Sequence, residues 1–206
     1  MKSDVYGADY YFYGVESGKS CYQNYRWIPE LTMPLAMTMI DLLRIEKHHT
    51  ILDVGCALGY LVKAFRLLHR QAWGIDISEF AIENTDPSVR QYCSCSLPAT
   101  PEVFDFCIAK DVFEHVPANN LKKLLEEIPA QTMFAIMPLG KEGNYTAPSN
   151  NMDVTHCICE DIYWWENLFI NAGWFIQNKG YKVSGIKEQY YKNHPHAHGF
   201  FFLEKI

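Results

Sequence analysis

The sequence predicts an α/β fold in which helices cover both faces of a doubly wound, mainly parallel sheet. Three observations predict it. Short apolar strands alternate with amphipathic helices through most of the chain. A glycine-containing turn follows the first of these strands. Two strand-like segments end the chain, and the loop between them is too short for a crossover helix, so we expect an antiparallel last strand.

The first 30 residues are rich in aromatic side chains and glycine and show no sustained period, which predicts an irregular arm. Thr32 and Pro34 suit the first turn of a helix, and the apolar run after them predicts a buried or lid helix that ends near Glu46. We therefore divide the chain into an N-terminal lid arm and helix, residues 1–47, and a main domain, residues 48–206.

The main domain begins with a short, apolar, β-branched strand that is typical of strands buried on both faces. It stops at Gly55, and an amphipathic helix begins after Gly59. The next helix has a predicted cap at Ser78, and the last one stops at Gly173. The predicted strands are residues 50–54, 72–76, 90–93, 104–109, 131–137, 174–183 and 200–204.

Composition and charge limit the function classes. A chain of 206 residues fits one domain with a small appendage. Its formal net charge of -6 provides no positive field for nucleic acid phosphates or an anionic membrane, so a non-specific polyanion binder is excluded. The N-terminus lacks the pattern of a secretory signal and no run approaches the ~18 apolar residues of a membrane span, so we expect a cytoplasmic protein without a membrane partner.

The seven cysteines favour reduced thiols, because their count is odd and they are scattered through apolar segments. Two pairs, Cys93 with Cys95 and Cys157 with Cys159, are spaced more closely than structural zinc ligands usually are. We therefore expect no metal site. The run His194, His196 and His198 offers alternate residues to a metal, but loop histidines at the surface are the simpler interpretation.

A small-molecule site is predicted where the first strand ends. Gly55 and Gly59 let the backbone pass close to a ligand before a helix begins. The second strand ends at Asp76, where a carboxylate can accept hydrogen bonds from both ribose hydroxyls of a nucleoside. A dinucleotide site would need G-x-G-x-x-G, and the turn here has only G-x-x-x-G.

These segments resemble the class I S-adenosylmethionine-dependent methyltransferases. ILDVGCALGYLVKAF is similar to their first motif, GIDISEFAIE to the second, and FDFCIAKDVFEHVP to the region of the fourth strand. The resemblance covers about residues 50–205 and implies a seven-stranded Rossmann-like sheet with an antiparallel last strand. It also implies S-adenosylmethionine as the cofactor. Ala57 replaces the middle glycine of the family's loop, and a serine replaces the acid often found after the third strand.

The resemblance implies three groups of cofactor contacts. One binds the methionine end, the second the ribose and adenine, and the third, which includes the backbone at Lys110, supplies the remaining contacts. In that order the groups are Asp53, Gly55, Cys56 and Gly59; Asp76 and Ile77; and Ser94, Cys95 and Lys110.

The aromatic arm suits a lid over this cofactor, because tyrosine faces attract cations and a sulfonium is a cation. Tyr10, Tyr11, Tyr13 and Tyr25 are the candidates, and filling the gap between arm and sheet is the structural alternative for each. Arg26 is a candidate for the cofactor carboxylate, or a surface residue.

The acceptor side is predicted at the carboxyl ends of the fourth and fifth strands. His115 and His156 are candidate bases, because an unperturbed histidine is ready to take a proton at physiological pH. A packing role for His115 is an equal alternative. The other candidates for substrate contact are Asp111, Glu114, Tyr10, Tyr11, Asp153 and His196.

The sequence thus predicts an S-adenosylmethionine-dependent methyltransferase that acts on a small-molecule acceptor, most readily at a hydroxyl of a sugar or biosynthetic intermediate. DNA is disfavoured as an acceptor, because Lys110-Asp111-Val112-Phe113 stands where base-amino methyltransferases carry Asn or Asp followed by Pro-Pro and an aromatic. A protein or RNA methyltransferase and a non-catalytic nucleoside-binding module remain as alternatives.

Overall fold

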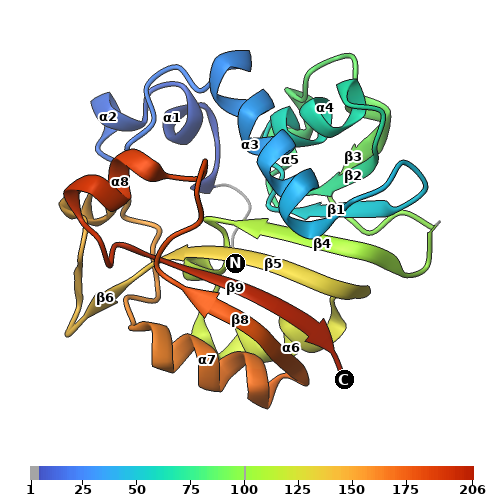
Figure 1. Ribbon diagram of the computed structural model, residues 1–206. Helices are drawn as coiled ribbons and strands as arrows, with labels where there is room; N and C mark the ends of the chain where they lie inside the picture. Colours follow the sequence, from blue (N-terminus) through green and yellow to red (C-terminus); the bar gives the residue numbers. More distant parts are fainter. Residues whose placement is uncertain (1–4, 100) are drawn as a thin grey trace.

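The computed structural model describes residues 5–99 and 101–206. Its centre is a seven-stranded sheet in the order β3-β2-β1-β4-β5-β9-β8 (Figure 1). The first five strands in this order are parallel, and β9 runs antiparallel to both of its neighbours. The predicted fold class is therefore confirmed. The strands are β1 Thr50–Val54, β2 Gln71–Ile75, β3 Cys93–Ser94, β4 Phe104–Lys110, β5 Ala130–Pro138, β8 Trp174–Gly180 and β9 His198–Lys205, with a small hairpin of β6 Gly140–Lys141 and β7 Asn144–Tyr145.

Helices form a layer on each face of the sheet. Figure 1 shows α3, α4 and α5 on one face and α6 and α7 on the other. The core on the first face is built around Met39 and Phe65, and the core on the second around Trp165, Phe169 and Trp174. The helices are α1 Ala8–Tyr11, α2 Gly14–Ser17, α3 Pro29–Leu43, α4 Tyr60–Leu67, α5 Glu79–Glu83, α6 Ala118–Glu127, α7 Ile162–Asn171 and α8 Glu188–Asn193.

The strand order fixes where a ligand can bind. After β3 the chain returns to the middle of the sheet, so β1 lies between β2 and β4 and the order reverses at β1 and β4. In open α/β sheets the crevice for a ligand lies outside the carboxyl ends of the strands at this reversal. Figure 1 shows α1, α2 and α8 gathered at the end of the sheet toward which β4 and β5 point.

Two local predictions were wrong. Helix α3 begins at Pro29 rather than at Thr32, because proline suits the first helical position; the hydroxyl of Thr32 donates to the carbonyl of Ile28 instead of capping. Residues 90–92 form a 3₁₀ turn, in which the amide of Tyr92 donates to Val89, so only two residues remain for β3. The predicted lack of a crossover between β8 and β9 is confirmed, because the loop contains only the short helix α8 and the two strands pair antiparallel.

The N-terminal arm packs against the glycine turn. Tyr6, Tyr10 and Tyr11 form a small core with Leu58 and Ala81. The carbonyl of Tyr6 accepts a 2.6 Å hydrogen bond from the hydroxyl of Ser78. Ser78 also caps α5 as predicted, because its side chain accepts from the amide of Ala81. The arm is thus tied to the element that follows β2.

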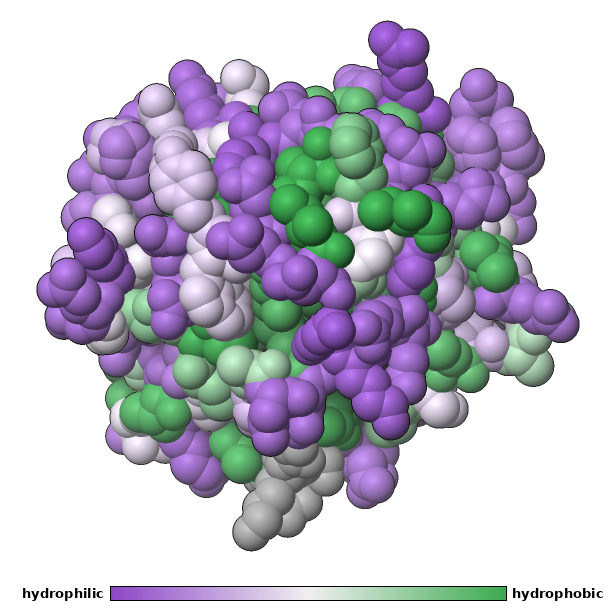
Figure 2. All heavy atoms as spheres, turned by 90° about the horizontal axis from the view of Figure 1, so that it is seen from below, coloured by the Kyte–Doolittle hydropathy of each residue, from purple (hydrophilic) through white to green (hydrophobic). Residues whose placement is uncertain are grey.

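The surface is mostly polar. Figure 2 shows hydrophilic side chains over most of the face seen from below, with hydrophobic ones in several separate groups. Within the described residues, no helix has both the length and the apolar character that a bilayer crossing requires.

Candidate active site

The turn between β1 and α4 has the shape of a ligand-binding loop. Gly55 and Gly59 both have φ of +76°. The amides of Gly55 and Cys56 donate to the carbonyl of Ile75, which joins the turn to the end of β2. A Cβ on Gly55 would lie 2.5 Å from a methyl group of Val112, so only glycine fits there. Ala57 also lies in the left-handed region, with φ of +48°.

The carboxylate of Asp76 is held in one orientation by two backbone amides. One oxygen accepts from the amide of Ala57 at 2.8 Å, and the other from the amide of Ser78 at 2.9 Å. Each oxygen keeps a lone pair for a further donor. Burial raises the pKa of Asp76, and the two amides oppose that shift. The carboxylate lines a cavity of about 420 Å³, within the usual range for small-molecule sites.

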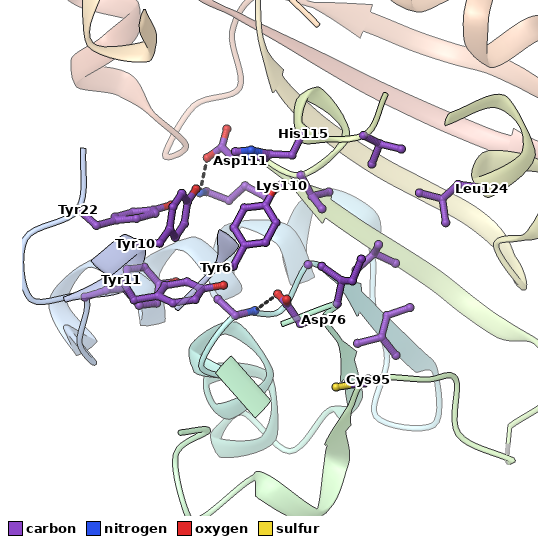
Figure 3. Close-up of a pocket in the computed structure, with 18 of the residues that line it drawn as sticks. Tyr6, Tyr10, Tyr11, Tyr22, Asp76, Cys95, Lys110, Asp111, His115 and Leu124 are labelled. Carbon is purple, nitrogen blue, oxygen red and sulfur yellow. Dashed lines mark hydrogen bonds and ion pairs between the residues drawn. The ribbon is translucent and has the colours of Figure 1, made fainter. Parts of the chain in front are cut away.

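This first cavity lies between the sheet and the arm. Figure 3 shows the ring of Tyr6 between Asp76 on one side and Asp111 and His115 on the other. The rings of Tyr6 and His115 meet edge to face at 5.9 Å. The predicted residues on its wall are Gly55, Asp76, Ile77, Cys95, Lys110, Asp111, His115, Tyr10, Tyr11 and Tyr25.

A second cavity of about 710 Å³ continues from the first. Gly55, Lys110, Asp111 and His115 line both, so the two form one cleft. The predicted residues that line only the second cavity are Asp53, Cys56, Arg26, Glu114, Asp153 and His156. Burial raises the pKa of Asp53 to about 8, although Lys110 partly offsets this effect.

The arm is fastened across the cleft by one buried hydrogen bond. The hydroxyl of Tyr10 donates to a carboxylate oxygen of Asp153 at 2.7 Å. The other oxygen of Asp153 accepts from the amide and the hydroxyl of Thr155. Asp153 therefore joins the arm to the loop before α7, and its other neighbour is His156, whose Nε2 lies 4.0 Å from the carboxylate.

Asp111 pairs with two lysines at the edge of the cleft. One of its oxygens lies 2.7 Å from Nζ of Lys110 and 2.8 Å from Nζ of Lys187. Burial by itself would raise the pKa of Asp111, but the two ammonium groups hold it well below its usual range. Nζ of Lys187 also lies 3.0 Å from Nε2 of His198. Asp111 is ionised and locked, with φ of +55°.

Glu114, His115 and His156 meet deeper in the cleft. The rings of the two histidines are 4.6 Å apart, and Nδ1 of His115 is 2.8 Å from the hydroxyl oxygen of Thr155. Burial first, and His156 second, lower the pKa of His115 to about 4. Burial also lowers the pKa of His156. Both imidazoles are therefore neutral at physiological pH.

Four predicted residues do not face the cleft. Tyr13 is 54% exposed and forms no part of its wall, because it follows α1 on the outer side of the arm. The hydroxyl of Ser94 donates to the carbonyl of Ser96. His196 is exposed and packs against Tyr181. Gly59 acts only through its backbone, at the start of α4.

Tyr6, Tyr22 and Lys187 also line the cleft, although they are not among the residues predicted from the sequence. Tyr6 and Tyr22 line the first cavity, and their place in the tyrosine-rich arm was the only available signal. Lys187 reaches the second cavity from the loop before α8. The sequence around this lysine has no motif that predicts a functional role for it. The histidine of the final run that reaches this region is His198, which is buried, rather than His196.

Residues 52–130 match a family model described as "Methyltransferase domain". This match runs from β1 to the first residue of β5 and agrees with the resemblance to the class I S-adenosylmethionine-dependent methyltransferases. No curated protein sequence matches the chain. Several solved structures also resemble the chain. Their sequence identity to it is low, so this likeness shows only that the fold is shared.

Three of these structures illustrate the methyltransferase fold. A SAM-dependent methyltransferase from Archaeoglobus fulgidus is 12% identical, with a TM-score of 0.60 over 83% of this chain and 93% of that one. Geranyl diphosphate C-methyltransferase from Streptomyces coelicolor, solved with Mg²⁺, geranyl diphosphate and S-adenosyl-L-homocysteine, is 12% identical, with a TM-score of 0.59 over 84% and 78%. The [4+2]-cyclase SpnF is 15% identical, with a TM-score of 0.62 over 91% and 86%.

The cofactor of the methyltransferase domain is S-adenosylmethionine, and the cleft fits it. Asp76 offers two fixed acceptors for ribose hydroxyls. Ile77 and Cys95 lie beside Asp76 on the wall of the first cavity, where an adenine would pack. Gly55 lines both cavities and Asp53 lines the second, so the methionine end of the cofactor would lie where the two cavities meet.

Proposed function

We propose that this methyltransferase domain acts on a small molecule and methylates a hydroxyl oxygen. One observation carries the proposal: the cofactor cavity and the second cavity share a wall, so a cofactor and an acceptor can meet in one cleft. When bound, the cofactor supplies an electrophilic methyl group on a sulfonium. The protein then has to align the acceptor and exclude water.

The N-terminal arm lies where it can exclude water from the cleft. Tyr10 and Tyr11 are each 4% exposed, and the bond from Tyr10 to Asp153 spans the cleft. Their rings also offer faces to the positive charge of a sulfonium. Tyr25 stacks on Tyr60 at the start of α4, which holds the arm near the methionine end.

The proposed acceptor side holds the imidazole of His115 and a group of fixed charges. Asp111, Lys110 and Lys187 form a rigid ionic group that can orient a polar acceptor. His115 lies on the wall that both cavities share. A base works best with a pKa near the working pH, so a pKa of about 4 favours positioning of the acceptor over proton removal as the role of His115.

Single-turnover transfer from labelled S-adenosylmethionine to a panel of sugars and other hydroxylated intermediates tests the activity. We expect a methylated product, and we expect His115→Ala and His156→Ala to slow its formation. Labelled cofactor that binds without methyl release across the panel would favour a non-catalytic module. SpnF, which has a similar fold, is named as a cyclase, so the fold by itself does not require methyl transfer.

The cofactor site has its own test. We expect Asp76→Ala to weaken binding of S-adenosylhomocysteine by about 100-fold, because two hydrogen bonds to a charged group disappear. Titration calorimetry measures this affinity. Asp86→Ala is the matched control, since its carboxylate pairs with Lys63 and does not line the cleft. Equal affinities of the two variants would contradict the assignment of Asp76.

A further inference from the structure

Three potential metal ligands meet at the deep end of the cleft. Glu114, His115 and His156 each offer one ligand atom, and these atoms lie within 4.8 Å of one another. Two of them stand side by side on the 3₁₀ turn Phe113–His115 after β4, and the third comes from the loop before α7. Ligand atoms that share an ion at ~2.1 Å lie roughly 3–4 Å apart, so a small side-chain movement closes the set.

The carboxylate of Glu114 lacks the partner that its burial demands. The residue is fully buried, and neither carboxylate oxygen has a hydrogen-bond partner among the described residues. Nε2 of His156 lies 3.9 Å from one of its carboxylate oxygens. Lys110 and Lys187 are already bonded to Asp111. A buried carboxylate without a partner is costly, and a cation between the three side chains would satisfy it.

The surroundings also fix the ring of His115. The hydroxyl of Thr155 donates its one proton to Asp153 at 2.5 Å, so the bond between Thr155 and Nδ1 of His115 must be donated by the imidazole. Nε2 of His115 therefore keeps a lone pair. Metal-binding histidines are usually held in this way, by a hydrogen bond from the nitrogen that does not bind the metal.

We propose that Glu114, His115 and His156 bind one divalent transition-metal ion at the acceptor end of the cleft. Two imidazoles and one carboxylate suit Mn²⁺, Co²⁺ or Zn²⁺ better than Mg²⁺ or Ca²⁺. The sequence predicts no metal site, because His156 comes from a different loop and its separation from Glu114 and His115 along the chain matches no metal-binding motif. The role of the ion rests on the proposed function: it would hold an acceptor hydroxyl and lower its pKa.

The test is a Co²⁺ titration of the untagged, full-length protein after treatment with a chelator. The d–d absorption and equilibrium dialysis report binding without any methyl transfer. We expect one Co²⁺ per chain. Glu114→Gln and His156→Gln should each weaken binding by at least ~100-fold, and Thr155→Val by ~10-fold, because it only positions His115. His196→Gln is the matched control and should bind as the wild type does, since that histidine is exposed, packs against Tyr181 and does not line the cleft.

The affinity for S-adenosylhomocysteine, measured on the same samples, shows that the cleft of each variant is intact. Two results would overturn the metal site: no Co²⁺ binding by a protein that binds S-adenosylhomocysteine, or unchanged Co²⁺ affinity in both Glu114→Gln and His156→Gln. Either result leaves the proposed methyl transfer standing. Conversely, Co²⁺ binding with the expected losses in a protein that methylates no acceptor supports the metal site and removes the proposed function.

Discussion

At the scale of single residues, Ala57 shows how the ligand loop departs from the pattern of its family. The residue has φ of +48°, where an L-residue is disfavoured by ~1–2 kcal/mol. It keeps this conformation because its amide donates to Asp76, the residue that faces the cofactor cavity. The alanine therefore serves the site at a cost in stability.

We expect Ala57→Gly to raise the free energy of unfolding by about 0.5–1 kcal/mol, because relief of the left-handed strain exceeds the entropy that glycine adds to the unfolded chain. Urea denaturation measures the change. The matched control is Ala64→Gly inside α4, where the backbone is helical and the same substitution should destabilise by ~1 kcal/mol or more. Destabilisation by both variants would show that Ala57 is not strained.

At the scale of elements, the N-terminal arm is attached to the domain through a few tyrosines rather than through the sheet. Tyr10 meets Tyr6 edge to face at 5.0 Å and donates to Asp153. The contact between α1 and the loop before α7 therefore depends on one charge-assisted hydrogen bond and on ring packing.

Tyr10→Phe keeps the ring and removes only this bond. We expect it to weaken binding of S-adenosylhomocysteine by about 10-fold, since a hydrogen bond to a charged group is worth ~1.5 kcal/mol or more and the arm closes the cavity. Calorimetry measures the affinity. Tyr13→Phe, on the same arm but 54% exposed, is the matched control. If both variants bind as the wild type does, the arm is not a lid held by Tyr10.

The loop between β8 and β9 introduces a pH-dependent contact. Burial first, and the charge of Lys187 second, lower the pKa of His198 to about 3. In the unfolded chain its pKa is ~6.5, so the unfolded state takes up a proton at higher pH than the folded state does. The stability that neutral His198 provides is therefore present above pH ~6.5 and is lost as the pH falls toward 3.

His198→Gln should remove this dependence. Between pH 7 and pH 5 we expect the wild type to lose about 2 kcal/mol more of its free energy of unfolding than the variant loses. Denaturant titrations at the two pH values give the difference, in which the contributions of other titrating groups cancel. Parallel losses in the two proteins would show that His198 titrates normally.

At the scale of the whole molecule, charge and topology limit the partners. The net charge of -6 gives no overall attraction to a polyanion, and the cleft opens at the carboxyl ends of the parallel strands, where a small ligand is enclosed between arm and sheet. These features favour a small acceptor over a nucleic acid.

We therefore expect no micromolar binding of labelled duplex DNA or single-stranded RNA at physiological salt, measured by fluorescence anisotropy. Electrostatic binding of either one weakens steeply with salt. Micromolar affinity with a steep salt dependence would contradict this prediction and return RNA to the list of acceptors.

The sequence by itself determined the order of the elements, the antiparallel end of the sheet and the presence of Gly55 and Asp76 at the ends of β1 and β2, where a cavity lies. Strand patterns, Gly55, Gly59 and Asp76 act through local backbone geometry, which neighbouring residues fix. Only the tertiary structure decided which of the candidate acceptor-side residues lie together. Lys187, His198 and the cluster of Glu114, His115 and His156 lie together because distant loops meet at the end of the sheet. Side chains that act across such loops leave no spacing in the sequence, because their distances depend on how the strands are ordered and how the loops pack.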